Sequence, residues 1–135
     1  MSQLQNSRTR RAPIVLIVDD NPSIRNVVSW SLRFGGYEPV EAANGQEAAN
    51  WMEQAAREKR YPAIILLDLA MPVMDGRAFM AWLQAAWPAH YPAPAIIIIT
   101  AGHLDEKQFN PYVKQVVSKP FHVRDLLEVI HKWEA

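Results

Sequence analysis

The stretch AIILLDLAMPVMDG, residues 63–76, says more about the fold than any other part of the chain. Its first five residues form an apolar run of the kind that makes a strand buried on both faces of a parallel sheet. Asp68 follows this run directly, and a carboxylate presented at the end of a buried strand can act as a nucleophile. The stretch therefore predicts a buried strand with a candidate reactive group at its end.

Four other short runs rich in Val and Ile alternate with longer segments of helical period. This alternation predicts an α/β fold, with a parallel sheet covered by helices on both faces. The second run carries charge and a proline, which favours the rim of the sheet. The expected strands are 14–18, 38–41, 63–67, 95–99 and 113–117.

Capping residues and glycines mark the ends of the expected helices. The first helix should begin at Asn21-Pro22 and end at Gly35-Gly36, and the others should cover 45–60, 76–86 and 123–133. The segment 104–112 is short and contains a proline, so it has room for only about two helical turns. We expect the inward residues of the first and third helices to be Ile24, Val27, Val28, Ser31 and Leu32, and Phe79, Leu83 and Ala86.

Length and composition predict one domain, with a polar tail over residues 1–12 followed by the domain over 13–135. The chain has no cysteine, which excludes disulfides and thiolate metal sites. Fourteen basic and fourteen acidic side chains balance, so no overall field favours nucleic acid as a partner. No apolar run approaches the ~20 residues that span a bilayer. We therefore expect a cytoplasmic protein with no membrane insertion and no direct nucleic-acid binding.

Three further strand ends carry polar residues that complement Asp68. They are Asp19-Asp20, Thr100 and Lys119-Pro120. In an open parallel sheet ligands bind at the carboxyl ends of the strands, so these residues should meet at one edge. One pair of neighbouring carboxylates costs on the order of 4 kcal/mol at ~4 Å and an effective dielectric of 20, so the acids need a cation. An oxygen-rich set of this kind suits Mg²⁺, with Lys119 and the Thr100 hydroxyl available to a phosphoryl group.

Each of these residues also has an ordinary structural interpretation. Asp20 or Asn21 can cap the first helix, and an aspartate at a strand end is often a turn former. Thr100 is common in strands, and Lys119 can be a solvated lysine. Their coincidence at four strand ends nevertheless favours a functional site for phosphoryl transfer.

With these motifs in place, the chain resembles the response-regulator receiver domain of two-component signalling, the CheY-like family, over residues 14–133. The resemblance implies a flavodoxin-like sheet of strand order 2-1-3-4-5. It also implies that Asp68 is the phosphoacceptor and that Asp19, Asp20, Asp68 and the Ala70 backbone carbonyl bind Mg²⁺. Thr100 would be the switch hydroxyl, and Lys119 would precede a cis proline peptide.

Two departures from the family pattern bear on signalling. Receivers usually carry an aromatic residue three positions before the lysine, where this chain has Val116. A valine cannot swing a large ring between two pockets, so the usual coupling of threonine to aromatic is in doubt. The chain also looks about three residues shorter than typical receivers between Thr100 and Lys119, and we expect a stunted fourth helix there.

Aromatic and apolar residues suggest two contact surfaces. Trp30 lies off the inward stripe of the first helix, one turn before Phe34, and receivers typically meet the phosphodonor along this helix. We therefore expect Trp30 and Phe34 to form the docking surface, or else a half-buried flank. Val129 and Trp133 extend the stripe of the last helix sideways and suit a dimer or target contact.

The predicted function is a phosphoacceptor that takes a phosphoryl group from a histidine kinase or a histidine phosphotransfer domain onto Asp68 and switches the binding of an unknown downstream protein. Two other classes compete with it. A phosphorylation-independent interaction module is favoured by Val116 and the short fourth helix. An aspartate-nucleophile phosphatase would use a similar set, but it normally has an acid where this chain has Ala70, and it needs a cap that no segment can provide.

Overall fold

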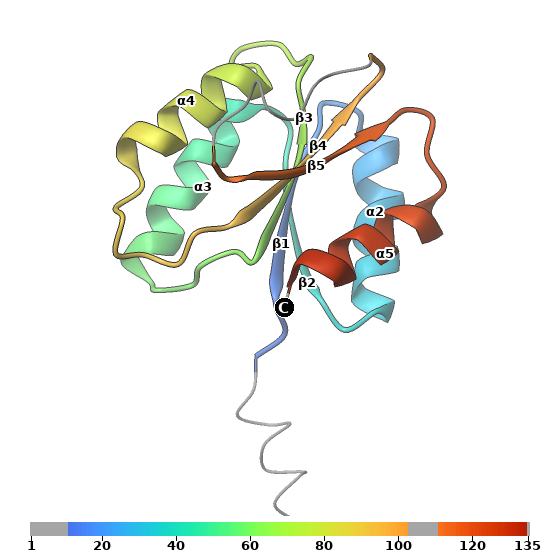
Figure 1. The fold of residues 1–135 in the computed structure, drawn as a ribbon, viewed down its shortest axis with the longest axis horizontal. Coiled ribbons are helices and arrows are strands. Elements are labelled where there is room, and N and C mark those ends of the chain that lie inside the picture. Colours follow the sequence, from blue (N-terminus) through green and yellow to red (C-terminus); the bar gives the residue numbers. More distant parts are fainter. Residues whose placement is uncertain (1–10, 103–110, 135) are drawn as a thin grey trace, which may run out of the picture.

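Five parallel strands form one sheet in the order β2-β1-β3-β4-β5 in the computed structural model, which describes residues 11–102 and 111–134 (Figure 1). The order and the parallel pairing agree with the expectation from the sequence. The strand at one rim is β2, as its charge and proline predicted, and β5 forms the other. The strands are β1 (Ile14–Val18), β2 (Glu38–Ala42), β3 (Ile64–Asp68), β4 (Ala95–Thr100) and β5 (Val113–Ser118).

Helices cover both faces of this sheet, so its central strands have no side open to water (Figure 1). One face packs on α3 and α4 around Met52, Phe79 and Leu83, and the other packs on α2 and α5 around Leu32 and Leu126. Residues of β1, β3 and β4 alternate between these two clusters because successive strand side chains point to opposite faces. The helices are α2 (Pro22–Phe34), α3 (Gly45–Arg57), α4 (Gly76–Ala86) and α5 (Val123–Glu134).

The helix boundaries agree with the expected ones to within a few residues, but two inward positions were wrong. Val27 is 52% exposed, although we expected it to face the core with Val28 and Leu32. Ala86 is exposed in the last turn of α4, and Met80 is buried in that helix. The buried stripe of α2 is narrower than its apolar residues suggest, and that of α4 is shifted around the helix from Ala86 toward Met80. The expected short fourth helix within 104–112 falls almost entirely outside the described residues.

Two glycines explain how the segment after β3 folds back beside Asp68. A Cβ on Gly76 would lie 2.5 Å from the Asp68 carbonyl oxygen, so only glycine lets α4 begin this close to the strand end. A Cβ on Gly45 would lie 2.7 Å from the Met74 carbonyl oxygen, which accepts a hydrogen bond from the Gly45 N–H at 2.8 Å. The loop between β3 and α4 is therefore fixed against both the strand end and the start of α3.

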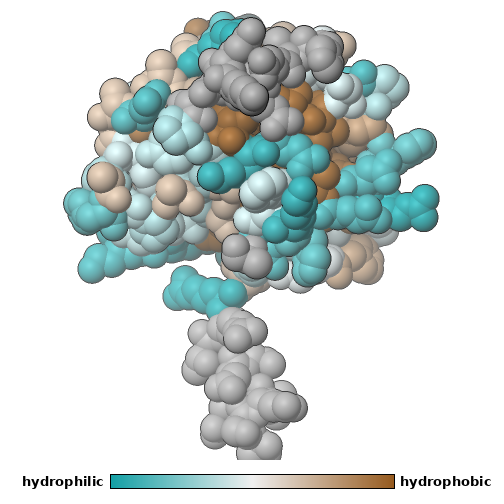
Figure 2. Space-filling model, in the orientation of Figure 1, coloured by the Kyte–Doolittle hydropathy of each residue, from teal (hydrophilic) through white to brown (hydrophobic). Residues whose placement is uncertain are grey.

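The two ends of the described chain lie together at the amino-terminal edge of the sheet. Arg11 and Glu134 line one hollow there, together with residues that precede β3 and β4. Figure 2 shows the face crossed by β5 and α5, where hydrophilic residues cover much of the surface and hydrophobic ones gather near the middle. None of the helices in residues 11–102 and 111–134 combines the length and the apolarity that crossing a bilayer requires.

Candidate functional site at the carboxyl edge of the sheet

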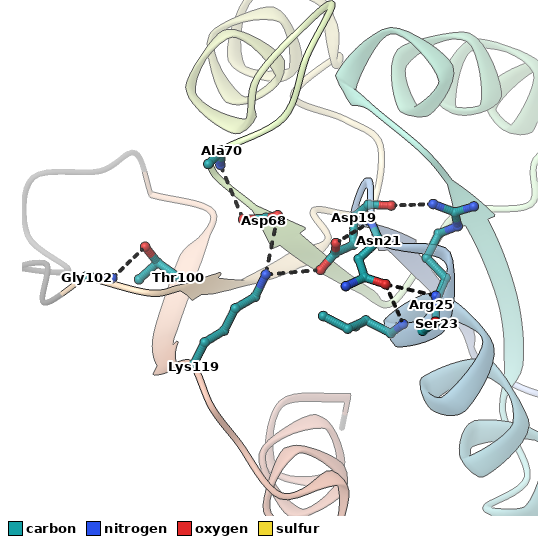
Figure 3. Close-up of polar contacts among 10 residues, drawn as sticks. Asp19, Asn21, Ser23, Arg25, Asp68, Ala70, Thr100, Gly102 and Lys119 are labelled. Carbon is teal, nitrogen blue, oxygen red and sulfur yellow. Dashed lines mark hydrogen bonds and ion pairs between the residues drawn. The ribbon is translucent and has the colours of Figure 1, made fainter.

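The strand ends named in the sequence meet at the carboxyl edge of the sheet. Asp19 and Asp20 follow β1 and Asp68 ends β3, and their carboxylates each place an oxygen within 4.8 Å of the others. Lys119, just after β5, places its Nζ 3.5 Å from Asp19 Oδ2 and 3.5 Å from Asp68 Oδ2 (Figure 3). The structure therefore brings together the three acids and the lysine that were predicted to share a site.

Asp68 is buried, and its surroundings raise the pKa of its carboxyl group above the ordinary value. Burial is the largest cause, because removal from water penalises the charged form. The Ala70 N–H, which donates to Asp68 Oδ1 at 3.2 Å, and the Lys119 ammonium both act in the opposite direction. Burial thus disfavours the ionised form of Asp68, and among the described residues only the Ala70 N–H and the Lys119 ammonium favour it.

Asp19 is held at several points and still leaves one oxygen unsatisfied. Its N–H donates to the Ala42 carbonyl at 3.1 Å, and its Oδ1 accepts the Asn21 N–H at 2.9 Å. Its Oδ2 is buried and has no hydrogen-bond partner. A buried carboxylate oxygen that accepts no hydrogen bond is costly, and the Lys119 Nζ at 3.5 Å compensates its charge only in part, so Oδ2 is free to bind a cation.

The start of α2 shows which of Asp20 and Asn21 caps the helix. The Asn21 side chain caps the helix, since its Oδ1 accepts the N–H groups of Ser23 at 2.9 Å and Ile24 at 3.3 Å. Asp20 is therefore not the cap. Its carboxylate is exposed and lies within the acidic cluster.

The charges of the site suit a small divalent cation. Three carboxylates and one ammonium give a formal sum of −3 + 1 = −2, which one Mg²⁺ ion would neutralise. Mg²⁺ binds through a few carboxylate oxygens and keeps several waters, which fits a cluster with one exposed acid. Among the described residues the donor set contains only oxygen, which disfavours zinc.

Thr100 ends β4 beside the cluster, with its side chain turned elsewhere. The Thr100 carbonyl accepts the Lys119 N–H at 2.7 Å, which ties the two strand ends together. Its Oγ1 accepts the Gly102 N–H at 3.2 Å, and Figure 3 shows the hydroxyl on the side facing Gly102, away from Asp68. The Lys119-Pro120 peptide is cis, as expected.

The predicted contact residues fall into two different environments. Trp30 and Phe34 are 64% and 77% exposed, and their rings meet edge to face with centroids 4.5 Å apart. Val129 and Trp133 are half-buried against the core, and the Trp133 indole N–H donates to Gln115 Oε1 at 2.8 Å. Trp133 thus has a structural role in fastening α5 to β5, and a contact role for Val129 and Trp133 stays a prediction.

One group beside the site was missed by the sequence analysis. Arg25 Nη1 donates to the Asp19 carbonyl at 2.7 Å, and Arg25 Nε pairs with Glu41 Oε1 at 3.2 Å. The buried Ser29 hydroxyl donates to Glu41 Oε2 at 2.9 Å. The available signal was an arginine one turn after the cap of α2, facing the strand end, but Glu41 was used only as a sign of a rim strand.

Comparison with known proteins assigns the chain to a family. Residues 15–131 match the family described as the response regulator receiver domain, and the chain belongs to this family. It is 32% identical over 127 residues to the sensor protein GacS of Pseudomonas syringae, covering 91% of this chain and 14% of GacS. It is 40% identical to the probable transcriptional regulator ycf27 of Pyropia yezoensis, covering 83% of this chain and 43% of ycf27.

A solved structure supports the same assignment. The response regulator TrrA of Thermotoga maritima, in complex with Mg²⁺ and a beryllofluoride group, is 26% identical and superposes with a TM-score of 0.73 over 90% of this chain and 98% of TrrA. Receivers of this family act as signalling switches rather than as classical enzymes and bind Mg²⁺ through an acidic pocket. The chain spans less than half the length of the two curated relatives named above.

Proposed function

We propose that this receiver accepts a phosphoryl group on Asp68 from a phosphohistidine and that this modification changes its affinity for a downstream protein. The observation that carries the proposal is the convergence of Asp19, Asp20, Asp68 and Lys119 around one buried Asp19 oxygen that accepts no hydrogen bond. An isolated acid at a strand end would not require that arrangement.

In the proposed reaction an oxygen of Asp68 forms a bond to phosphorus while the bond from phosphorus to the donor imidazole nitrogen breaks. The electron pair of that bond returns to the imidazole, which leaves as the neutral ring once it is protonated. Lys119 neutralises charge on the phosphoryl oxygens from the β5 side. Asp19, Asp20, Asp68 and the Ala70 carbonyl would hold Mg²⁺, which when bound would supply further positive charge to the phosphoryl oxygens.

Thr100 has a proposed role after transfer. Its hydroxyl accepts the Gly102 N–H in this structure, and rotation of the side chain would let it donate to a phosphoryl oxygen on Asp68. Val116 lies opposite Ile98 in the β4–β5 pair and packs against the core around Phe79. The downstream response should therefore proceed through movement of Thr100 without a rotating ring at position 116.

The proposed approach of the phosphodonor is along α2. A mainly apolar groove beside Lys119 lies between α2 and the segment leading into α5, and it includes Ile24, Val27, Pro120 and Phe121. Val27 continues toward the exposed pair Trp30 and Phe34 on the same helix. We propose that a helix carrying the phosphohistidine covers this surface, which brings the imidazole to the acidic cluster.

The experiment that tests the function is phosphorylation by a small donor. The protein incubated with acetyl phosphate and Mg²⁺ should gain the mass of one phosphoryl group, and Asp68→Asn should gain none. Beryllofluoride with Mg²⁺ should bind the wild type alone. A wild-type protein left unmodified would support the phosphorylation-independent module instead.

The docking surface has its own test. Trp30→Ala should slow phosphotransfer from a histidine phosphodonor domain by about tenfold, since truncating a central exposed tryptophan in an interface commonly costs more than 1 kcal/mol. Phosphorylation by acetyl phosphate should be unchanged. Arg33→Ala, on the same helix, serves as the matched surface control. Equal slowing with both donors would show that Trp30 acts through folding and not through docking.

The setting of the reaction follows from the proposed donor. Histidine kinases take their phosphoryl group from ATP, so we place the reaction in the cytoplasm. The absence of direct nucleic-acid binding stays a prediction, because ycf27 is a probable transcriptional regulator and more than half of its length lies outside the matched region. A homodimer likewise stays a prediction.

A further inference from the structure

The acidic site has a second layer of support built on α2 and β2. Arg25 points from the first turns of α2 toward the end of β1, and its guanidinium reaches the Asp19 carbonyl oxygen at 2.7 Å (Figure 3). Glu41 holds the same guanidinium through Nε at 3.2 Å. The buried hydroxyl of Ser29 fixes the other oxygen of Glu41 at 2.9 Å.

We propose that Arg25 is a positioning residue for the cation-binding acids. Its guanidinium joins two anchors, with Nη1 donating to the carbonyl group between Asp19 and Asp20 and Nε donating to Glu41, and so sets the direction in which this dipeptide presents its two carboxylates. This inference rests on the proposed Mg²⁺ site and adds a residue to it that touches no ligand.

The geometry shows why the carbonyl contact matters. The Asp19 N–H is bonded to Ala42 and the Asp19 Oδ1 to the Asn21 N–H, so the carbonyl is the remaining polar group of the Asp19 main chain. Arg25 holds that group, and Asp20 follows it directly. With all three groups fixed, Asp19 Oδ2 is left buried in the cluster, where it accepts no hydrogen bond and lies 3.5 Å from Lys119 Nζ.

The charges show why an arginine is tolerated so close to a cation site. Glu41 cancels the formal charge of Arg25, so the pair contributes +1 − 1 = 0 and the acidic cluster keeps its sum of −2. The pair can therefore fix the geometry without competing with a divalent ion. Positioning and electrostatics then predict opposite results when Arg25 is replaced.

The test is the affinity for Mg²⁺ measured by isothermal titration calorimetry on Arg25→Met. Removing a nearby positive charge alone would tighten Mg²⁺ binding. Loss of the two anchors should instead weaken it, on the order of tenfold, as is usual for residues that orient metal ligands. Unchanged or tighter binding in the folded variant would overturn the proposal.

Two further variants complete the design. Arg25→Lys keeps the charge beside Glu41 and loses the guanidinium, so it should also bind Mg²⁺ more weakly than the wild type, and wild-type affinity would overturn the proposal even if Arg25→Met fails to fold. Arg33→Met removes the same charge from the exposed last turn of α2 and should keep wild-type affinity. A wild-type protein that binds no Mg²⁺ would refute the cation site itself, which is a different result.

Discussion

Asp68 occupies an energetically unfavourable position, and this supports its proposed role as phosphoacceptor. Its carboxylate is buried, faces Asp19, and receives a main-chain N–H and a lysine at 3.5 Å in return. A cation would supply what these contacts lack. The folded protein should therefore become more stable when a cation binds beside Asp68 or when the negative charge of Asp68 is removed.

Asp68→Asn should stabilise the folded protein at neutral pH in the absence of divalent ions, on the order of 1 kcal/mol, because the buried charge is removed. The folded pKa of Asp68 is raised, so its ionisation favours the unfolded state, and stability is lost as pH rises through that pKa. The gain should shrink as pH falls below the raised pKa, because Asp68 then becomes protonated in the folded wild type. Thermal unfolding across this pH range in EDTA measures it.

Asp125→Asn is the control for this comparison, since it removes one charge from the exposed first turn of α5. It should give no gain at neutral pH. An Asp68→Asn gain that is the same at pH 4 and pH 7 would show that the effect comes from packing and not from charge.

The loop between β3 and α4 stores strain beside the site. Val73 has a φ of 70° and is 84% exposed, so a β-branched residue adopts the left-handed conformation without burying its side chain. The loop keeps this shape because Gly45 and Gly76 hold it on both sides. The strain is therefore imposed by the neighbouring elements.

Val73→Asn should raise the free energy of unfolding by about 1 kcal/mol, because asparagine enters the left-handed region at lower cost than valine. Urea unfolding of the two proteins measures the difference. Val73→Thr keeps the β-branch and is the matched control, which should show no comparable gain. Equal stability of the wild type and Val73→Asn would show that the backbone at this position is not strained.

The whole molecule should gain stability from Mg²⁺ only through the acidic edge of the sheet. A ligand that binds the folded state alone contributes RT ln(1 + [L]/Kd), so free Mg²⁺ at ten times its Kd should add about 1.4 kcal/mol. Asp20→Asn should reduce this response, and Asp125→Asn should keep it. A rise in Tm with Mg²⁺ that persists in Asp20→Asn would place the cation elsewhere.

The sequence predicted the structure best where a local pattern of residues has a single structural interpretation. Apolar runs and caps located the strands and most helix boundaries, and polar strand ends located Asp19, Asp20, Asp68 and Lys119. Exposure of Val27 and Ala86 could not be read from helical period alone, because the width of a buried stripe depends on what packs against it. Arg25 was missed because its contact with Glu41 joins residues sixteen positions apart, which helical period does not reveal.

The shared hollow of Arg11 and Glu134 has a practical consequence for assembly. The described chain begins and ends at the edge of the sheet opposite Asp68, so residues 11 and 134 lie near each other on the side of the molecule away from that carboxylate. Modules joined at these two points would leave the approach to Asp68 open, which suits a receiver that is one domain of a longer protein.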